Sequence, residues 1–438
     1  MARSLADWLA LQEAAHPKSI DLGLERVAAV ARRLGLERPS SAVITVGGTN
    51  GKGSTAAHLE ALLLAAGRSV GLFTSPHFLR YNERIRLDGA EAEDADIIEA
   101  FERIEAARGA ITLTFFEYNA LAALYLFAQR GVEFALLEVG LGGRLDATNL
   151  VDADVSVVCS VGLDHRDWLG ETLEEIGAEK AGIFRATRPA VLGTARMPQS
   201  VYAAIERLGA RPIVAEQDFS WRVQPTAVGE GSWSYRGLRL HLSELPPSVL
   251  AGSIQYRNAA TALAALEALA LGGARSGAAE VVLAALDART VAAALRRVRL
   301  AGRFQIVPGP IEWILDIAHN PPAAEVLAAQ LKERPCQGRT FAVVGILGDK
   351  DAPAIGAALA PAVQRWFLCD LHGPRGIGAE ELARRLHAVA REPTLAASVA
   401  EACAAARAAA RPGDRIVVCG SVHTVGPALE WLGVYSAG

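Results

Sequence analysis

The sequence predicts an α/β protein with a parallel, doubly wound sheet, followed by a second, smaller α/β domain. Three observations support this prediction. Predicted strands and helices alternate along the first half of the chain, which is typical of a parallel sheet covered by helices on both faces. Two of these strands, residues 134–139 and 155–161, are unbroken apolar runs, as expected of strands buried on both sides. A second alternating set begins near Gly302.

Composition and charge exclude several classes of protein. The 438 residues carry a net charge of −4, so we expect two or three domains and no nucleic-acid partner, which would require a basic patch. No run of about 18 apolar residues predicts a membrane span. Asp7 and Glu13 make the start of the chain an amphipathic helix rather than a signal peptide. The five cysteines include no CxxC pair and are expected to be small buried residues, so we expect a cytoplasmic protein.

The first domain is expected to begin its sheet with a β-branched strand at residues 43–46, which runs into a glycine-rich loop. Apolar residues at helical spacing then alternate with short apolar runs. The predicted helices are 56–66, 94–107, 118–129 and 173–184, and the further strands are 69–73, 134–139, 155–161 and 189–192.

Residues 218–243 depart from this pattern. Alternating side chains and glycine turns predict a small antiparallel excursion there, after which helices return. The second set has predicted strands at 311–317, 340–346, 366–369 and 415–419, and its Ala-rich stretch 395–410 is expected to be a helix. We therefore place the domain boundary near Leu300, which gives domains of residues 1–299 and 300–438.

The segment GGTNGKGST has the context of a phosphate-binding loop, because it follows a strand and opens a helix. Its glycines allow backbone N–H groups to turn toward phosphate oxygens, and the helix N-terminus adds a favourable dipole. Lys52 would neutralise phosphate charge, and either Ser54 or Thr55 could bind the phosphate or its magnesium ion. The strict Walker pattern fails, because Val46 replaces its first glycine and Gly53 follows the lysine. A glycine-rich turn with an incidental lysine is the alternative, but the agreement of strand, loop and helix favours the phosphate site.

Ordered motifs along nearly the whole chain make this loop more specific. Together with GTNGKGS they resemble the folylpolyglutamate synthase family, particularly its bifunctional bacterial dihydrofolate synthase members. That family belongs to the wider Mur-ligase type of ATP-dependent amide ligases. The resembling segments are FTSPHFLRYNERIRLDG, LEVGLGGRLDATN, VGLDHRDWLG, GAEKAGIFR, YRNAATAL, AGRFQ, DIAHNP, GDKD, HGPRG and GSVHTVG.

The resemblance implies a Mur-ligase-like first domain that binds ATP and pterin, and a Rossmann-like second domain that serves glutamate ligation. ATP would convert a carboxylate into an acyl phosphate, which the amine of L-glutamate then attacks. Positioning and charge neutralisation dominate such phosphoryl transfer. The residues that the resemblance assigns to ATP are Thr49, Asn50, Gly51, Lys52, Gly53, Ser54, Asn258, Arg303, Asp316 and His319. For Asp316 and His319, capping of the following helix is the alternative.

The resemblance also implies Mg²⁺ ligands at Ser75, Glu138 and His165. Glu138 ends a buried strand, where ligands bind in open α/β sheets, and its carboxylate suits magnesium. From the residue alone, Glu138 could equally cap a helix or pair with Arg144. Imidazole suits transition metals better than magnesium, so His165 alone would be interpreted as a loop histidine or general base. Ser75 alone would be a turn cap before a proline.

Lys180 is the third residue, with Lys52 and His165, to which the resemblance gives a catalytic role. It is carbamylated in similar proteins, which would turn a cation into an anion with two acceptor oxygens. From the residue alone, Lys180 would be a solvated helix lysine that pairs with Glu175 or Glu179.

Two segments bear on the acceptor substrate. Asp21 and Leu22 resemble part of the bacterial dihydropteroate-binding segment, and Phe115 and Phe116 resemble the wall of the same pocket. Aromatic faces could stack on a flat pterin, although both phenylalanines could equally be core residues at a helix start. The presence of both segments favours a bifunctional enzyme, which adds L-glutamate to dihydropteroate and then to tetrahydrofolate species. We expect a monomer that uses ATP and Mg²⁺, and the sequence leaves open a need for a monovalent cation such as K⁺.

Three alternatives compete with this interpretation. The chain could have folylpolyglutamate synthase activity alone, or it could be another Mur-type amide ligase, against which the GTNGKGS and DLGL spellings argue. It could also be a nucleotide-dependent regulator that joins no substrates. In that case Glu138, His165 and Lys180 would have no clear purpose.

Overall fold

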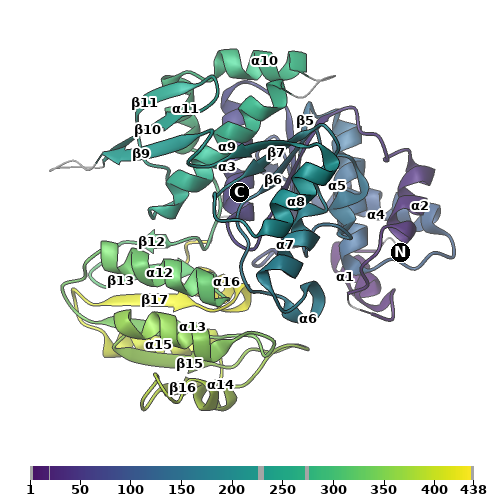
Figure 1. Cartoon of the computed structure of the whole chain (residues 1–438). Coiled ribbons are helices and arrows are strands. Elements are labelled where there is room, and N and C mark those ends of the chain that lie inside the picture. Colours follow the sequence, from purple (N-terminus) through teal and green to yellow (C-terminus); the bar gives the residue numbers. More distant parts are fainter. Residues whose placement is uncertain (1–2, 19, 225–230, 272–275, 436–438) are drawn as a thin grey trace. The chain divides into compact units, whose positions relative to one another are not determined.

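The computed structural model describes residues 3–18, 20–224, 231–271 and 276–435, and it divides into two compact units (Figure 1). Unit 1 takes the residues up to Val249 together with Tyr256–Arg299. Unit 2 takes Leu250–Gln255 and the residues from Leu300 onward. The short segment Leu250–Gln255, which the sequence placed in the first domain, therefore belongs to unit 2. Among the described residues, no helix is both long and apolar enough to cross a membrane.

A mostly parallel sheet forms the centre of unit 1, in the order β4-β3-β2-β5-β1-β6-β7-β8 (Figure 1). From β2 to β8 neighbouring strands run parallel, whereas β3 pairs antiparallel with both β2 and β4. The strands are Ala42–Gly47 (β1), Val70–Phe73 (β2), Ile85–Leu87 (β3), Ala90–Glu91 (β4), Phe134–Glu138 (β5), Val155–Val158 (β6), Pro189–Leu192 (β7) and Arg211–Val214 (β8).

Two helices of unit 1 are buried on all sides, which is expected of helices inside a protein. Every residue is buried from Gly53 to Leu63 on α3, and from Glu117 to Phe127 on α5. Helix α3 packs against β1, β2, β5 and α11, and α5 lies between β2 and the helices α1, α2 and α4. These helices are α1 (Leu5–Ala14), α2 (Glu25–Leu34), α3 (Lys52–Ala65), α4 (Asp94–Arg108), α5 (Phe115–Arg130) and α11 (Ala288–Leu295).

Unit 1 contains further helices and two short turns. The helices are α6 (Arg166–Leu169), α7 (Leu173–Ala181), α8 (Gln199–Leu208), α9 (Ile254–Ala270) and α10 (Ser276–Ala285). Short 3₁₀ turns lie at Tyr81–Arg84 and Ala147–Leu150. The first two residues of α9 belong to unit 2, so this helix passes from one unit into the other.

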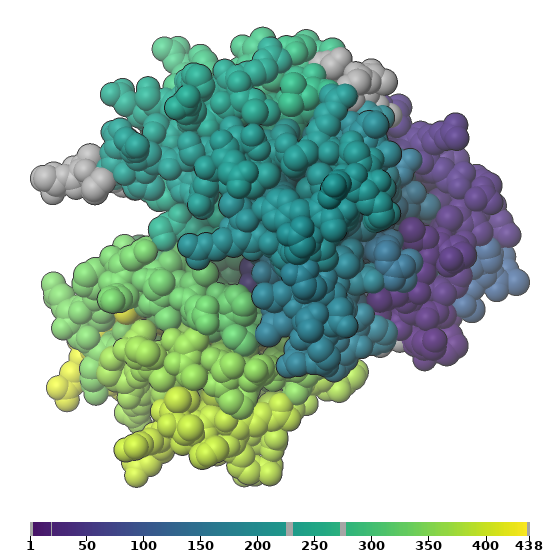
Figure 2. Space-filling view, in the orientation of Figure 1, coloured from purple at the N-terminus to yellow at the C-terminus, as the bar shows by residue number. Residues whose placement is uncertain are grey.

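The predicted antiparallel excursion is confirmed. Its strands are Ser220–Gln224 (β9), Ser232–Arg236 (β10) and His241–Leu245 (β11), and they form a separate antiparallel sheet in the order β11-β10-β9. Residues 225–230 of the predicted segment lie outside the described residues. In Figure 1 these strands lie at the upper left, away from the N-terminal helices α1 and α2 at the right, and Figure 2 gives the space-filling view in the same orientation.

Unit 2 contains a second sheet in the order β12-β13-β17-β14-β15-β16, in which only the β12–β13 pair is antiparallel among the described strands. The strands are Gln305–Val307 (β12), Glu312–Asp316 (β13), Thr340–Val344 (β14), Arg365–Cys369 (β15), Thr394–Ala396 (β16) and Arg415–Cys419 (β17). The helices are Pro321–Glu333 (α12), Ala352–Leu359 (α13), Ala379–Arg385 (α14), Val399–Ala409 (α15) and Val422–Trp431 (α16), with a 3₁₀ turn at Ala360–Ala362.

Several predicted boundaries are wrong by three or more residues, including those of the helices predicted at 118–129 and 173–184, which span Phe115–Arg130 and Leu173–Ala181. The helix expected at 56–66 begins at Lys52. Its N-cap is Gly51, a residue of the glycine-rich loop, so the helix follows the loop directly. The Ala-rich stretch 395–410 is not helical throughout, since its first residues belong to β16 and Ser398 caps a helix that begins at Val399. The apolar run 155–161 forms a strand only as far as Val158.

Candidate active site

The loop after β1 turns at two glycines with left-handed backbone angles, Gly48 (φ 135°) and Gly51 (φ 92°). A Cβ atom on Gly48 would lie 3.0 Å from the backbone nitrogen of Cys159, so glycine is needed there for space as well as for conformation. The loop is fastened to the segment after β6, because the Thr49 amide donates to the Ser160 carbonyl at 2.8 Å. Such a turn at a helix start presents backbone amides to an anion.

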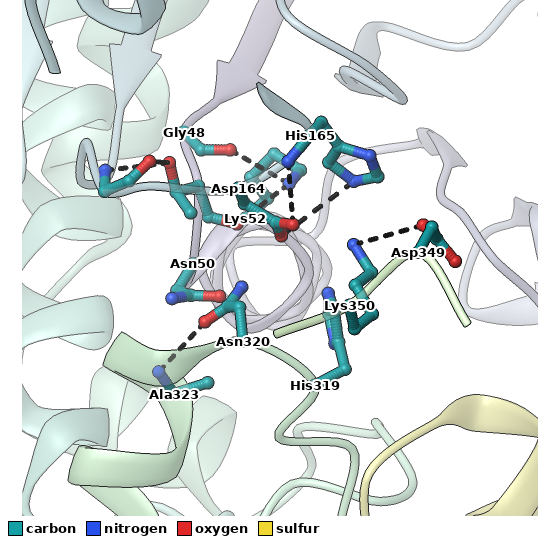
Figure 3. Close-up of polar contacts among 12 residues, drawn as sticks. Gly48, Asn50, Lys52, Asp164, His165, His319, Asn320, Ala323, Asp349 and Lys350 are labelled. Atoms are coloured by element: carbon teal, nitrogen blue, oxygen red, sulfur yellow. Dashed lines mark hydrogen bonds and ion pairs between the residues drawn. The ribbon is translucent and has the colours of Figure 1, made fainter. Parts of the chain in front are cut away.

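Lys52 lies over this loop. Its amine donates to the carbonyl oxygens of Gly48 at 2.9 Å and Thr49 at 3.3 Å, and Figure 3 shows the first of these contacts. The sequence left open whether Ser54 or Thr55 serves the phosphate. Both are buried, and the Thr55 hydroxyl lies 3.4 Å from the Cys159 sulfur.

The other predicted nucleotide residues of unit 1 gather around the same loop. The Asn50 amide donates to the Ser160 hydroxyl at 3.1 Å, and the Asn50 carbonyl accepts from that hydroxyl at 2.9 Å. Gly53 is buried in the first turn of α3. Asn258 of α9 is also buried, and its Oδ1 lies 3.1 Å from the place that a Cβ atom on Gly51 would take.

Two of the three predicted metal ligands lie side by side. Glu138 ends β5, is 3% exposed, and accepts hydrogen bonds from the Thr74 hydroxyl and, at 3.3 Å, from the Ser75 amide. The neighbouring strands β2 and β5 thus bring Ser75 and Glu138 together at their carboxyl ends. These are hard oxygen donors that fit Mg²⁺, which usually also keeps water and phosphate oxygens in its shell. No three His, Cys, Asp or Glu side chains converge on a metal cage in the described part of the chain.

His165, the third predicted ligand, precedes α6 with a backbone φ of 52°, an uncommon value for a residue other than glycine. Its amide donates to Asp164 Oδ1 at 2.9 Å, and its Nε2 lies 3.9 Å from Asp164 Oδ2 (Figure 3). The Asp164 carboxylate therefore lies beside both the backbone and the ring of His165, and it was not predicted from the sequence. The adjacent letters DH after a buried strand were the available signal.

Two alternatives left open by the sequence are wrong. Arg144 pairs with Glu179 at 2.8 Å rather than with Glu138. Lys180 is 4% exposed rather than solvated. It is not paired with Glu175, whose carboxylate accepts the hydrogen bonds that cap the start of α7.

The environment of Lys180 disfavours its charged form. Burial, and after it the positive charge of Lys52, lower the pKa of the Lys180 amine to about 7, although Asp164 and Asp146 act in the opposite direction. Above pH 7 most of this amine is therefore uncharged. An uncharged amine is the form that can react with carbon dioxide.

Asp146 organises the loop that follows β5, another role that the sequence analysis missed. Its carboxylate accepts from the Leu141 amide at 2.8 Å and from the Thr148 amide and hydroxyl at 3.0 and 2.6 Å. Burial raises the pKa of this carboxyl group. A Cβ atom on Gly143 would lie 2.9 Å from the Lys180 carbonyl oxygen, so the loop packs directly onto α7.

In unit 2, the structure brings three predicted residues to the carboxyl end of β13. The Asp316 carboxylate accepts from the amides of Phe304 and Ala318, each at 2.8 Å, and so holds the turn that carries Arg303. Burial raises the pKa of Asp316, while the positive charge of Arg303 opposes this shift. His319 Nδ1 lies 2.9 Å from a backbone carbonyl oxygen of the same turn.

The capping role considered for Asp316 and His319 is wrong. Asn320 caps α12, because its Oδ1 accepts from the Ala323 amide at 3.0 Å (Figure 3).

The four predicted acceptor residues lie in the N-terminal part of unit 1. Asp21 and Leu22 are half-buried in the segment between α1 and α2. Phe115 and Phe116 form the first turn of α5, where both are half-buried and pack against the hydrophobic core. A Cβ atom on Gly140 would lie 2.4 Å from the Phe116 ring, so this ring lies close to the loop after β5. The two phenylalanines are therefore both core contacts and partly accessible surfaces.

Comparisons with known proteins agree with these features. Residues 46–266 match the Mur ligase middle domain, and residues 302–422 match the Mur ligase, glutamate ligase domain. The chain is 44% identical to the dihydrofolate synthase/folylpolyglutamate synthase of Escherichia coli over 437 residues, which covers 100% of this chain and 97% of that protein.

Solved structures give the same result. FolC of E. coli in complex with DHPP and ADP aligns with a TM-score of 0.90 and 43% identity, over 99% of this chain and 98% of that one. A bifunctional folylpolyglutamate synthase/dihydrofolate synthase with Mn, AMPPNP and L-glutamate bound aligns with a TM-score of 0.87 and 42% identity, over 98% of both chains.

The chain belongs to the dihydrofolate synthase/folylpolyglutamate synthase family. The predicted family, the α/β fold class of the Mur ligases and the class of ATP-dependent ligase are thereby confirmed.

Proposed function

We propose that this chain uses ATP and Mg²⁺ to join L-glutamate to dihydropteroate, which gives dihydrofolate, and then to add glutamates to tetrahydrofolate species. The observation that carries the proposal is the glycine turn between β1 and α3, with Lys52 over it and Asn258 against it. The chain belongs to a family of folate–glutamate ligases, and this membership indicates the reaction for which ATP would be bound at this turn.

The residues present suit a magnesium ion. Ser75 and Glu138 would supply oxygen ligands, with His165, beside Asp164, as the third predicted ligand. When bound, Mg²⁺ would neutralise negative charge on the phosphates.

The protein's own groups would position the phosphates and the acid. Backbone amides of the loop and the Lys52 ammonium hold the triphosphate, so that an acceptor carboxylate oxygen attacks the γ-phosphorus and ADP leaves. The glutamate amine then attacks the acyl phosphate carbon, inorganic phosphate departs with the bonding electron pair, and the amine loses a proton. The product is an amide.

The uncharged amine of Lys180 would react with carbon dioxide. Its amine adds to carbon dioxide and releases a proton, which yields a carbamate with two acceptor oxygens. The low pKa of this lysine supports the proposal, because a protonated amine cannot form a carbamate.

We assign ATP and pterin binding to residues 1–299, and glutamate ligation to residues 300–438, where Arg303, Asp316 and His319 would contact the nucleotide. A cytoplasmic location, a monomeric state and the absence of nucleic-acid and membrane partners are part of the same proposal.

The deciding experiment measures ADP release with a panel of acceptors. We expect release only when ATP, Mg²⁺, L-glutamate and a pteroate acceptor are all present. Turnover with tetrahydrofolate but not with dihydropteroate would restrict the activity to folylpolyglutamate synthesis. ADP release that is indifferent to both glutamate and pterin would instead indicate a nucleotide-dependent regulator.

A further inference from the structure

A network of charged side chains surrounds Asp21 in the segment between α1 and α2. The Asp21 carboxylate lies 2.7 Å from Arg26 NH1, 3.2 Å from His16 Nε2 and 3.2 Å from Lys18 Nζ. Arg26 NH2 also donates to the carbonyl oxygen of Asp21 at 2.7 Å. One guanidinium thus holds both the side chain and the backbone of the same residue, which a planar fork of donors does well.

The same guanidinium reaches a second element. Arg26 NH2 lies 3.2 Å from Glu117 Oε1, and Glu117 is 3% exposed in the first turn of α5. The other carboxylate oxygen of Glu117 accepts from the Thr114 amide at 2.7 Å and caps the helix. A buried carboxylate needs a cation or donors close by, and Arg26 supplies a cation at ion-pair distance from Glu117 Oε1, an oxygen that accepts no hydrogen bond among the described residues.

The two segments joined in this way carry the four residues expected to contact the acceptor. Asp21 and Leu22 lie on one side of the link, and Phe115 and Phe116 immediately precede Glu117 on the other. The aromatic side is fixed independently by the core, since the Phe116 ring lies 5.6 Å from that of Phe73. The segment with Asp21 has no regular secondary structure of its own and depends on Arg26 for its polar contact with Glu117.

We propose that Arg26 is a positioning residue for the pterin acceptor: it holds the Asp21 segment against the start of α5, so that both parts of the acceptor site are formed before the substrate binds. This inference rests on the proposed function and adds to it the residue that assembles the acceptor site. A site that is assembled in advance binds without a further ordering cost. Loss of Arg26 should therefore weaken acceptor binding and leave the nucleotide loop unaffected.

The test compares the steady-state kinetics of Arg26→Met with those of wild type. We expect the KM for dihydropteroate to rise by about tenfold or more, with kcat and the KM for ATP changed by less than about twofold. The matched control is Arg32→Met on the same helix, where the side chain is 68% exposed and pairs with Glu37 at the surface. That variant should keep all wild-type constants.

Two further variants separate positioning from general stability. Glu117→Gln keeps an oxygen for the helix cap but removes the charge, and it should raise the same KM even if Arg26→Met fails to fold. Arg26→Lys keeps the positive charge but lacks the planar set of guanidinium donors. Its KM for dihydropteroate should therefore lie between those of Arg26→Met and wild type.

Each outcome has a distinct meaning. Absence of wild-type turnover with dihydropteroate would overturn the proposed function and, with it, this inference. Normal wild-type turnover with an unchanged acceptor KM in folded Arg26→Met and Glu117→Gln would overturn the inference alone. An equal rise of the KM for ATP and for dihydropteroate would also overturn it, because a merely structural defect affects both.

Discussion

At the scale of single residues, the candidate site contains two lysine amines in different environments. Lys52 contacts carbonyl oxygens of its own loop, and Lys180 is buried among groups that disfavour its charge. The positive charge of Lys52 contributes to the lowered pKa of Lys180. A substitution at either lysine should therefore alter the electrostatic environment of the other.

Lys52→Ala should lower kcat by about 10²–10³, because a preorganised contact to developing charge stabilises a transition state by several kcal/mol. The measurement is ADP release at saturating substrates. Lys332→Ala, which removes an exposed lysine from α12, is the control and should retain full activity. Near-normal turnover of Lys52→Ala would show that the loop is not the phosphate site.

Activity should depend on pH through Lys180. Its pKa is lowered to about 7, so the amine is mostly uncharged above that value and becomes protonated as the pH falls below it. At pH 6 only about a tenth of the amine is uncharged, so initial rates in CO₂-depleted buffer should fall and should respond to added bicarbonate less than at pH 8. Lys180→Ala should be impaired at every pH and partly recover with small carboxylates. Indifference to this substitution would remove Lys180 from the mechanism.

At the scale of elements, the antiparallel excursion is held to α9 by one buried carboxylate. Glu267 is 0% exposed and accepts from the Tyr235 hydroxyl at 2.6 Å and from the amides of Arg239 and Leu240 at 2.5 and 2.6 Å. The turn between β10 and β11 therefore depends on this side chain.

Glu267→Ala should lower the free energy of unfolding by about 3 kcal/mol, because buried donors are left without acceptors. Urea unfolding followed by tryptophan fluorescence measures the effect. The control is Glu280→Ala, which breaks an exposed pair with Arg239 and should cost less than about 1 kcal/mol. Equal losses in the two variants would contradict the anchoring role.

The elements differ in how far the sequence could predict them. Long apolar runs such as residues 134–139 identify buried strands, and the strand–loop–helix context identifies the phosphate loop. Short strands such as β3, β4 and β16 carry too few residues for a pattern. An Ala-rich stretch does not show where its helix begins, since that depends on the cap at Ser398.

The residues of the candidate site could also be predicted only in part from the sequence. Motifs pointed to Glu138, Ser75 and Lys180, but their supports, Thr74, Asp164 and Asp146, are polar loop residues with no periodicity of their own. The link from Arg26 to Glu117 joins residues far apart in the chain, so only the folded structure reveals it.

At the scale of the whole molecule, nucleotide binding should stabilise unit 1. An ATP analogue with Mg²⁺ at about 100 times its Kd should add about 2.7 kcal/mol to the free energy of unfolding of the part that binds it. Urea unfolding with and without the analogue measures this gain, and Lys52→Ala should reduce it. An equal gain in wild type and Lys52→Ala would place the nucleotide elsewhere.

Helix α9 begins in unit 2 and reaches Asn258, which touches Gly51, within its second turn. At 1.5 Å per residue, Asn258 stands about 4.5 Å along the helix axis from the last unit 2 residue, Gln255. Arg257→Pro would interrupt the start of this helix. The Asn258 side chain would then lose its fixed position against Gly51.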